Sequence, residues 1–198
     1  TSVEEVPLLG GISLDTEGII KSSQQAARSV MIICNPNNPT GNAFARSEIL
    51  QIVRESPGLV VVDEAYYEFS GETLADVINE YPNLLILRTF SKAFGLAALR
   101  VGYVLANKTL IADLNKVRQP YNVNSFSQQA AAIALKYLPA YLQQVAILKK
   151  EIQKISEELG QLPGVTVYPT AANFVLFRPA DCRTWAEEFA AKGFNTRY

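Results

Sequence analysis

The sequence predicts an α/β protein with a mostly parallel sheet, helices on both faces of that sheet, and the start of a small α+β domain. Three short apolar runs in the first half are continuous rather than alternating, which is typical of strands buried on both faces. These runs are Val30–Cys34, Leu59–Val62 and Leu84–Leu87. A helical segment over Ser47–Arg54 lies between the first two runs. Strand, helix and strand at this spacing indicate the βαβ unit of a parallel sheet.

Local signals set the limits of the elements in the first half. Ser47 is a possible N-cap of the first helix, and Pro57-Gly58 ends it. Residues Leu74–Asn79 predict a shorter helix before the third strand. A fourth apolar run, Val101–Leu105, follows the third too closely for a full helical crossover, so we expect it to pair antiparallel.

The second half predicts mainly helices. The longest has apolar residues at three- and four-residue spacing from Leu142 to Leu159 and ends at Gly160. The other predicted elements are helices over Asn107–Arg118, Ser125–Leu138 and Asp181–Lys192, and strands over Val165–Tyr168 and Asn173–Phe177. We expect residues 1–141 to form part of a large domain and residues 142–198 part of a small C-terminal domain.

Composition excludes several classes of function. The chain of 198 residues has 18 basic and 19 acidic side chains without a basic run, so we expect no nucleic-acid partner. It also contains no histidine. Without histidine, Ser-His-Asp and Cys-His catalysis are excluded, and Cys34 and Cys182 alone predict no metal site. Two cysteines make no disulfide framework, and no apolar stretch has the ~18–20 residues of a membrane span. We therefore expect a soluble, cytoplasmic protein without membrane contact.

Polar clusters follow the three predicted parallel strands directly. They are Asn35–Gly41, Asp63–Tyr66 and Thr89–Lys92. Ligands of open α/β sheets bind outside the carboxyl ends of the strands, where these clusters converge. Each cluster by itself is also compatible with turn chemistry or a helix cap. Their convergence favours a binding site.

Three charged residues define the chemistry of this edge. A carboxylate at Asp63, after the most apolar run, needs a cation, which is either a ligand or a distant Arg or Lys. Lys92 stands among apolar and hydroxyl neighbours, which favours an uncharged, nucleophilic amine for Schiff-base chemistry. Arg100 needs an anion, and its planar fork fits a phosphate. Pyridoxal phosphate combines a cationic heterocycle, an aldehyde and a phosphate.

The same residues carry a resemblance to a known family. Asn35–Gly41, Asp63–Tyr66 and Ser91–Gly102 resemble the three signatures of the class I and II aminotransferases of fold type I, and Tyr81–Lys92 most resembles the histidinol-phosphate aminotransferase branch. The resemblance implies pyridoxal 5'-phosphate as cofactor and amino transfer between histidinol phosphate and 2-oxoglutarate in histidine biosynthesis, by a homodimer. Members of the family are longer, so it also implies an internal segment whose large domain lacks its N-terminal part.

The resemblance also implies roles for individual residues. Lys92 would bind the cofactor aldehyde and move a proton, Asp63 would keep the ring nitrogen protonated, and Tyr66 would tune the phenolic oxygen. The implied cofactor-binding set is Asn35, Asp63, Tyr66, Thr89, Ser91, Lys92 and Arg100. Asn35 and Arg197 would contact the substrate, although Arg197 is equally compatible with a frayed surface charge.

Several alternatives remain open from the sequence. Glu64 is a rival for the acid role, but strand alternation directs it to the opposite face from Asp63. Tyr121, Asn122 and Asn124 are candidates for contact with a neighbouring subunit or for a solvated loop. For the whole protein, the alternatives are an aromatic or broad-specificity aminotransferase, a decarboxylase of a phosphorylated amino acid that uses the same cofactor, and a non-catalytic fragment.

Overall fold

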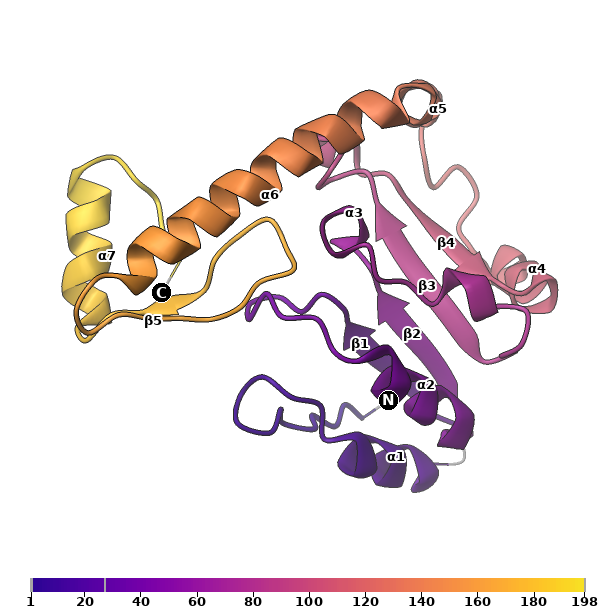
Figure 1. Cartoon of the computed structure of the whole chain (residues 1–198). Coiled ribbons are helices and arrows are strands. Elements are labelled where there is room, and N and C mark those ends of the chain that lie inside the picture. Colours follow the sequence, from indigo (N-terminus) through magenta and orange to yellow (C-terminus); the bar gives the residue numbers. More distant parts are fainter. Residues whose placement is uncertain (1, 27, 198) are drawn as a thin grey trace.

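The molecule is built around a four-stranded sheet. A computed structural model describes residues 2–26 and 28–197 (Figure 1). The sheet has the order β1-β2-β3-β4, with strands Val30–Cys34, Leu59–Asp63, Leu84–Thr89 and Gly102–Ala106. The first three strands are parallel, and β4 pairs antiparallel with β3. The predicted fold class and the antiparallel fourth strand are therefore confirmed.

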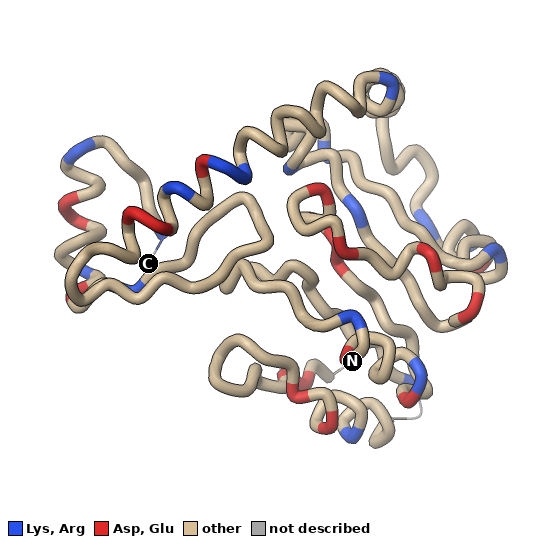
Figure 2. The backbone as a smooth tube through the Cα atoms, in the orientation of Figure 1, with Lys and Arg blue, Asp and Glu red and all other residues tan. Residues whose placement is uncertain are grey.

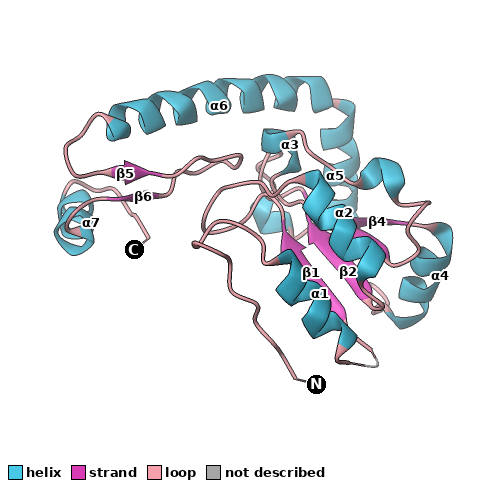
Figure 3. Ribbon diagram, turned by 60° about the horizontal axis from the view of Figure 1, so that its bottom comes forward, coloured by secondary structure: helices cyan, strands magenta, loops and turns pink. Residues whose placement is uncertain are grey.

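The main core lies between the sheet and two helices, α1 (Thr16–Gln24) and α2 (Arg46–Glu55) (Figure 3). Its fully buried residues come from α2 and from one face of the strands; they include Ile49, Ile52, Val60, Val62, Leu84 and Ile86. On the opposite face of β1, Val30 and Ile32 are 62% and 70% exposed. The prediction that this run is buried on both faces is therefore wrong for β1: side chains alternate along a strand, and the face that carries Val30 and Ile32 is open to solvent.

Helix starts differ from the sequence prediction in three places. Helix α1 was not predicted; Asp15 caps it by accepting a hydrogen bond from the Gly18 N–H. Helix α2 begins at Arg46, with the Glu48 carboxylate accepting the Ala45 N–H, so Ser47 is not its cap. The helix predicted over Leu74–Asn79 is only a 3₁₀ turn, η1 (Ala75–Val77), because Glu64 binds the Leu74 N–H and fixes the preceding chain.

The second half is dominated by the long helix α6 (Leu138–Gly160). Figure 1 shows it running from the end of α5 past the sheet to β5 and α7. The remaining elements are α3 (Tyr67–Ser70), η2 (Ala97–Leu99), α4 (Lys108–Val117), α5 (Ser125–Lys136), β5 (Thr166–Val167), β6 (Phe177–Arg178) and α7 (Cys182–Ala191). Helix α6 is continuous across residues 141 and 142, so the domain boundary expected there stays a prediction.

Strands β5 and β6 form a separate antiparallel pair at the far end of α6. Strand β5 is shorter than the predicted Val165–Tyr168 segment, and the predicted strand over Asn173–Phe177 is wrong except at Phe177, because residues 168–176 form a loop that extends toward the main sheet. In that loop Ala172 packs with Tyr66, Phe69 and Val145. The loop thus connects the C-terminal part of the chain to the end of the sheet.

Two further features of the helices are their length relative to a membrane span and the distribution of their charged residues. In the described residues, no helix by itself has both the length and the apolar character needed to cross a membrane; α5 and α6 meet that test only as a pair bent by 76°. Figure 2 shows acidic and basic residues interspersed over the chain, including the part of α6 that is remote from the sheet.

Candidate active site

The three parallel strands deliver polar residues to a single edge of the sheet. Cys34 pairs with Asp63 across β1 and β2, and the Asn35 N–H donates to the Asp63 carbonyl at 2.9 Å. Thr89 ends β3 opposite Gly102, the first residue of β4. A side chain at Gly102 would place its Cβ 2.7 Å from the Arg88 carbonyl oxygen, so glycine permits this pairing. The predicted convergence of the strand-end residues is therefore present.

Asp63 offers a carboxylate without an ion-pair partner among the described residues. It is half-buried, and its Oδ1 accepts the Ala65 N–H at 3.0 Å. Within residues 2–26 and 28–197 no lysine or arginine forms an ion pair with it. The alternative of a distant Arg or Lys partner is thus not realised in the described part of the chain.

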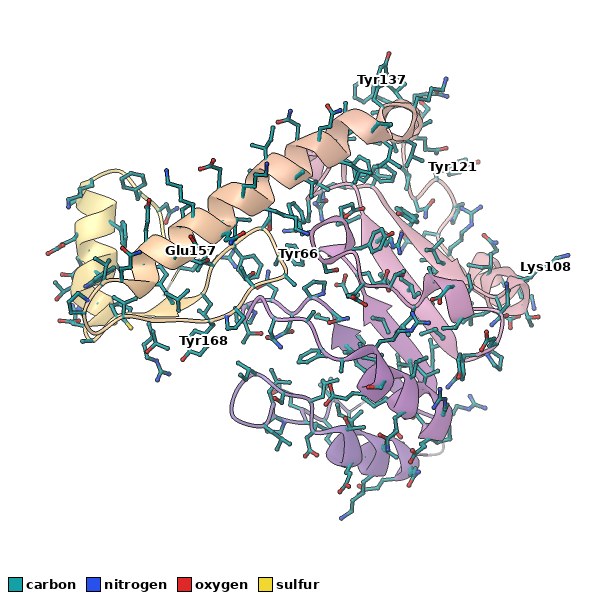
Figure 4. All side chains as sticks on the ribbon, viewed as in Figure 1. Tyr66, Lys108, Tyr121, Tyr137, Glu157 and Tyr168 are labelled. Carbon is teal, nitrogen blue, oxygen red and sulfur yellow. The ribbon has the colours of Figure 1, made fainter. Side chains whose placement is uncertain are left out.

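Tyr66 lies at the centre of the candidate site. It is 5% exposed, and its hydroxyl accepts a hydrogen bond of 2.8 Å from the Asn38 amide. The Lys92 Nζ lies 5.1 Å from the centre of its ring. Phe174, from the loop before β6, contacts the ring edge to face at 5.5 Å. In Figure 4 Tyr66 accordingly lies between that loop and the end of the sheet.

Asn38 is a site residue that sequence reasoning missed. Asn35, the residue predicted instead, is buried, and its Oδ1 accepts the Phe44 N–H at 2.8 Å. The side-chain carbonyl of Asn35 therefore holds the loop in place, whereas Asn38 is the asparagine in contact with Tyr66. Both belong to the segment Asn35–Gly41, and the sequence contains no signal that distinguishes which amide turns toward Tyr66.

Lys92 is exposed, which corrects the expectation of a desolvated amine. Its apolar sequence neighbours Phe90 and Phe94 turn away into a separate cluster with Val101, Ala131 and other residues of α5 and the preceding loop. The sequence prediction gave Lys92 more apolar neighbours than the structure does, because consecutive side chains in this turn point in different directions.

Thr89, Ser91 and Arg100 lie on neighbouring segments at the end of β3 and before β4. The Thr89 Oγ1 accepts the Ser91 N–H at 3.0 Å, and the Phe90 N–H donates to the Val101 carbonyl at 3.1 Å, which brings the segment of Arg100 alongside. Arg100 has a φ of 54° and is exposed, and its Nη1 donates to the Ala97 carbonyl. These hydroxyl, amide and guanidinium donors suit an anion.

Arg197 lies apart from these residues. It lines a cavity of about 490 Å³ together with Thr40, Tyr168, Arg178 and residues of α7. Lys92, Asp63 and Tyr66 do not line this cavity. Thr40 belongs to both this cavity and the Asn35–Gly41 loop, where it accepts a hydrogen bond from the Asn37 amide.

The pKa of the Cys34 thiol depends on the charge of Asp63. Burial first, and then the negative charge of Asp63, raise the pKa of Cys34 above its usual range. In a Cys182→Ser background, which leaves Cys34 as the one thiol of the sequence, we expect Asp63→Asn to lower that pKa. Since the thiolate is the reactive form, alkylation by iodoacetamide at pH 8 should become about two- to fivefold faster. An unchanged rate would contradict the proximity of the Asp63 charge to the thiol.

Comparison with known proteins places this geometry in a family. The family model described as "Aminotransferase class I and II" matches residues 2–192. The chain belongs to the class I and II aminotransferases. Among the relatives of this aminotransferase chain, the histidinol-phosphate aminotransferase of Desulfitobacterium hafniense (strain Y51) is 51% identical over 202 residues, which cover 100% of this chain and 56% of that protein. The chain thus spans about half the length of the curated relatives it matches.

Solved structures of the family have the same fold. The histidinol-phosphate aminotransferase of Sinorhizobium meliloti, solved in complex with pyridoxal-5'-phosphate, superimposes with a TM-score of 0.84 at 26% identity, covering 98% of this chain and 55% of that one. The L-threonine-O-3-phosphate decarboxylase of Porphyromonas gingivalis has a TM-score of 0.75 at 27% identity, covering 85% and 54%. These similarities confirm the fold-type resemblance deduced from the three sequence segments.

Proposed function

We propose that the full-length protein is a pyridoxal 5'-phosphate-dependent aminotransferase that exchanges an amino group between histidinol phosphate and 2-oxoglutarate in histidine biosynthesis. The observation that carries this proposal is the identity of 51% to a histidinol-phosphate aminotransferase along the whole chain. The geometry of the strand ends supports it independently, because it provides the groups that the cofactor requires.

The residues at the sheet edge fit the proposed cofactor. The half-buried Asp63 carboxylate has no cationic partner in the described residues, and a protonated ring nitrogen is a cation of suitable size. Thr89, Ser91 and Arg100 supply donors of the type that phosphate accepts. The Lys92 amine lies over the Tyr66 ring, 5.1 Å from its centre. The chemistry of this donor set thus corresponds to the three functional groups of pyridoxal phosphate.

Each residue has a defined task in this proposal. When bound, the cofactor supplies an electron sink for the substrate α-carbon. Asp63 would keep the ring nitrogen protonated, and Lys92 would hold the cofactor through its amine and take up the proton that leaves the substrate α-carbon. Tyr66 and Asn38 would hold the phenolic oxygen, and we assign this contact to Asn38 rather than Asn35 because the Nδ2 of Asn38 donates to the Tyr66 hydroxyl, whereas the Asn35 side chain binds the Phe44 N–H.

Substrate selection is tested with the full-length protein loaded with cofactor. We expect histidinol phosphate to convert the cofactor to its amine form, seen as loss of the visible absorption band, faster than phenylalanine or aspartate at equal concentration. Addition of 2-oxoglutarate should restore the band. A preference for phenylalanine would overturn the substrate and favour an aromatic or broad-specificity aminotransferase.

A decarboxylase is the second candidate, because the phosphothreonine decarboxylase of Porphyromonas gingivalis has a similar structure over 85% of this chain. Both enzymes named by the comparisons act on phosphorylated amines, so the phosphate alone does not discriminate them. The same assay separates them when released carbon dioxide is measured with L-threonine-O-3-phosphate. Release of carbon dioxide without restoration of the band by 2-oxoglutarate would favour the decarboxylase.

The proposed working form is a cytoplasmic homodimer. Val117, Tyr121, Phe126 and Tyr137 are 63–99% exposed, and Figure 4 shows Tyr121 and Tyr137 on the outer side of the chain near α5. Exposed large apolar side chains from several neighbouring segments of the sequence suit contact with a second copy. Cys34 and Cys182 are free thiols, as a reducing compartment requires. Sedimentation of the full-length protein at the monomer mass would contradict the dimer.

A further inference from the structure

A buried ion pair lies on the opposite face of the sheet from Asp63. The Glu64 side chain is 1% exposed and that of Arg88 is 11% exposed. Both the Nε and the Nη2 of Arg88 donate to the Glu64 Oε2, at 3.0 and 2.9 Å. The pair is therefore removed from water and held in a directional, two-bond geometry.

Further contacts complete this pair. The Thr73 hydroxyl donates to the Glu64 carboxylate and accepts a hydrogen bond of 2.7 Å from the Arg88 Nη2. The Leu74 N–H donates to the Glu64 Oε1, and the Arg88 guanidinium stacks 3.5 Å from the centre of the Tyr67 ring. A buried charge pair is tolerated when its hydrogen-bonding capacity is satisfied in this way.

The pair joins the two strand ends that carry the proposed cofactor contacts. Glu64 follows Asp63 in sequence, and Arg88 precedes Thr89. The Glu64 N–H also donates to the Leu87 carbonyl at 2.9 Å, which continues the β2–β3 pairing beyond Asp63. Asp63 would meet the ring nitrogen of the cofactor and Thr89 its phosphate, so the pair fixes one cofactor contact relative to the other.

We propose that the Glu64–Arg88 pair is a positioning device for the cofactor: from the reverse face of the sheet it sets Asp63 and Thr89 at the separation that the ring nitrogen and the phosphate require. This inference rests on the proposed cofactor. A buried ion pair contributes little net stability compared with well-packed apolar residues, so a purely stabilising role does not account for its placement.

Two variants test this role in the full-length protein. Glu64→Gln keeps the shape but leaves Arg88 without a counter-charge, and Glu64→Leu with Arg88→Met replaces the pair by apolar side chains, which commonly preserves stability. We expect both to bind pyridoxal phosphate about tenfold more weakly or worse, because the contacts lose their relative placement. We also expect the pH midpoint of the visible absorption of the bound cofactor to move. Glu187→Gln makes the same change in the exposed Arg183–Glu187 pair and should leave both properties unaltered.

The outcomes separate the inference from the proposed function. If the wild-type protein does not bind pyridoxal phosphate, the proposed function and this inference both fail. If the wild type binds and the folded double variant shows wild-type affinity and an unmoved pH midpoint, the pair is structural and only the inference is overturned. Loss of affinity with an unchanged urea unfolding midpoint in the double variant supports the positioning role.

Discussion

Replacing Lys92 by alanine is expected to abolish the covalent attachment of pyridoxal phosphate to the protein. The wild-type full-length protein, incubated with the cofactor and reduced with borohydride, should gain the mass of one reduced cofactor on the peptide that contains Lys92. The variant should gain none, because the amine that would attack the aldehyde is missing. Turnover should fall by about 10²- to 10⁴-fold, since the general acid–base group is lost with it.

The control for this prediction is a lysine at the opposite end of the sheet. Lys108 begins α4, directly after the end of β4 that pairs with the start of β3, and it is exposed to solvent. Lys108→Ala should label as the wild type does, at Lys92. If Lys92→Ala were labelled as strongly as the wild type at a single other lysine, the assignment of Lys92 would be refuted.

Replacing Asp63 by asparagine is expected to give a protein that still binds the cofactor but transfers amino groups poorly. The Asp63 carboxylate has no cationic partner in the described residues and is free to stabilise a protonated ring nitrogen. Asparagine retains the size of the side chain but not its charge. The ring nitrogen of the cofactor would therefore lose its proton, and the ring would accept electrons less readily. We expect turnover of the full-length protein to fall by about 10²- to 10³-fold.

An exposed aspartate serves as the reference for this substitution. Asp113 forms an exposed pair with Lys116 within α4, and Asp113→Asn should turn over like the wild type. Near-normal turnover of Asp63→Asn, with the cofactor bound, would eliminate the proposed role of Asp63. Weaker binding of the cofactor, with normal turnover once the protein is saturated with it, would instead limit the role of Asp63 to cofactor binding.

Much of the fold followed from strongly apolar segments. The predicted first strand, Val30–Cys34, coincides with β1, whereas its predicted burial on both faces is wrong, because Val30 and Ile32 are exposed. Helix α1 was missed because its sequence is mostly polar and its capping depends on Asp15. Ser47 was a plausible cap by type, but Glu48 supplies the bond instead, and this choice depends on the path of the loop before α2.

The candidate site was predictable in its location but not in its contacts. Polar residues that follow apolar strands meet at one edge of a parallel sheet, so Asp63, Thr89 and the Asn35–Gly41 loop converge for topological reasons. The asparagine that contacts Tyr66 is decided by the loop conformation, because the Phe44 N–H binds the Asn35 side chain. The exposure of Lys92 is decided in the same way, because Phe94 packs into a separate apolar cluster instead of against the lysine.

The sequence by itself therefore determined the α/β class, the edge at which the chemistry gathers and the residue types available there, because strand burial and alternation are properties of short segments. Only the tertiary structure decided that Asn38 faces Tyr66, that Lys92 is exposed and that Glu64 binds Arg88 behind Asp63. Those pairings join residues 24 to 28 positions apart, and a contact between distant residues depends on the packing of everything between them.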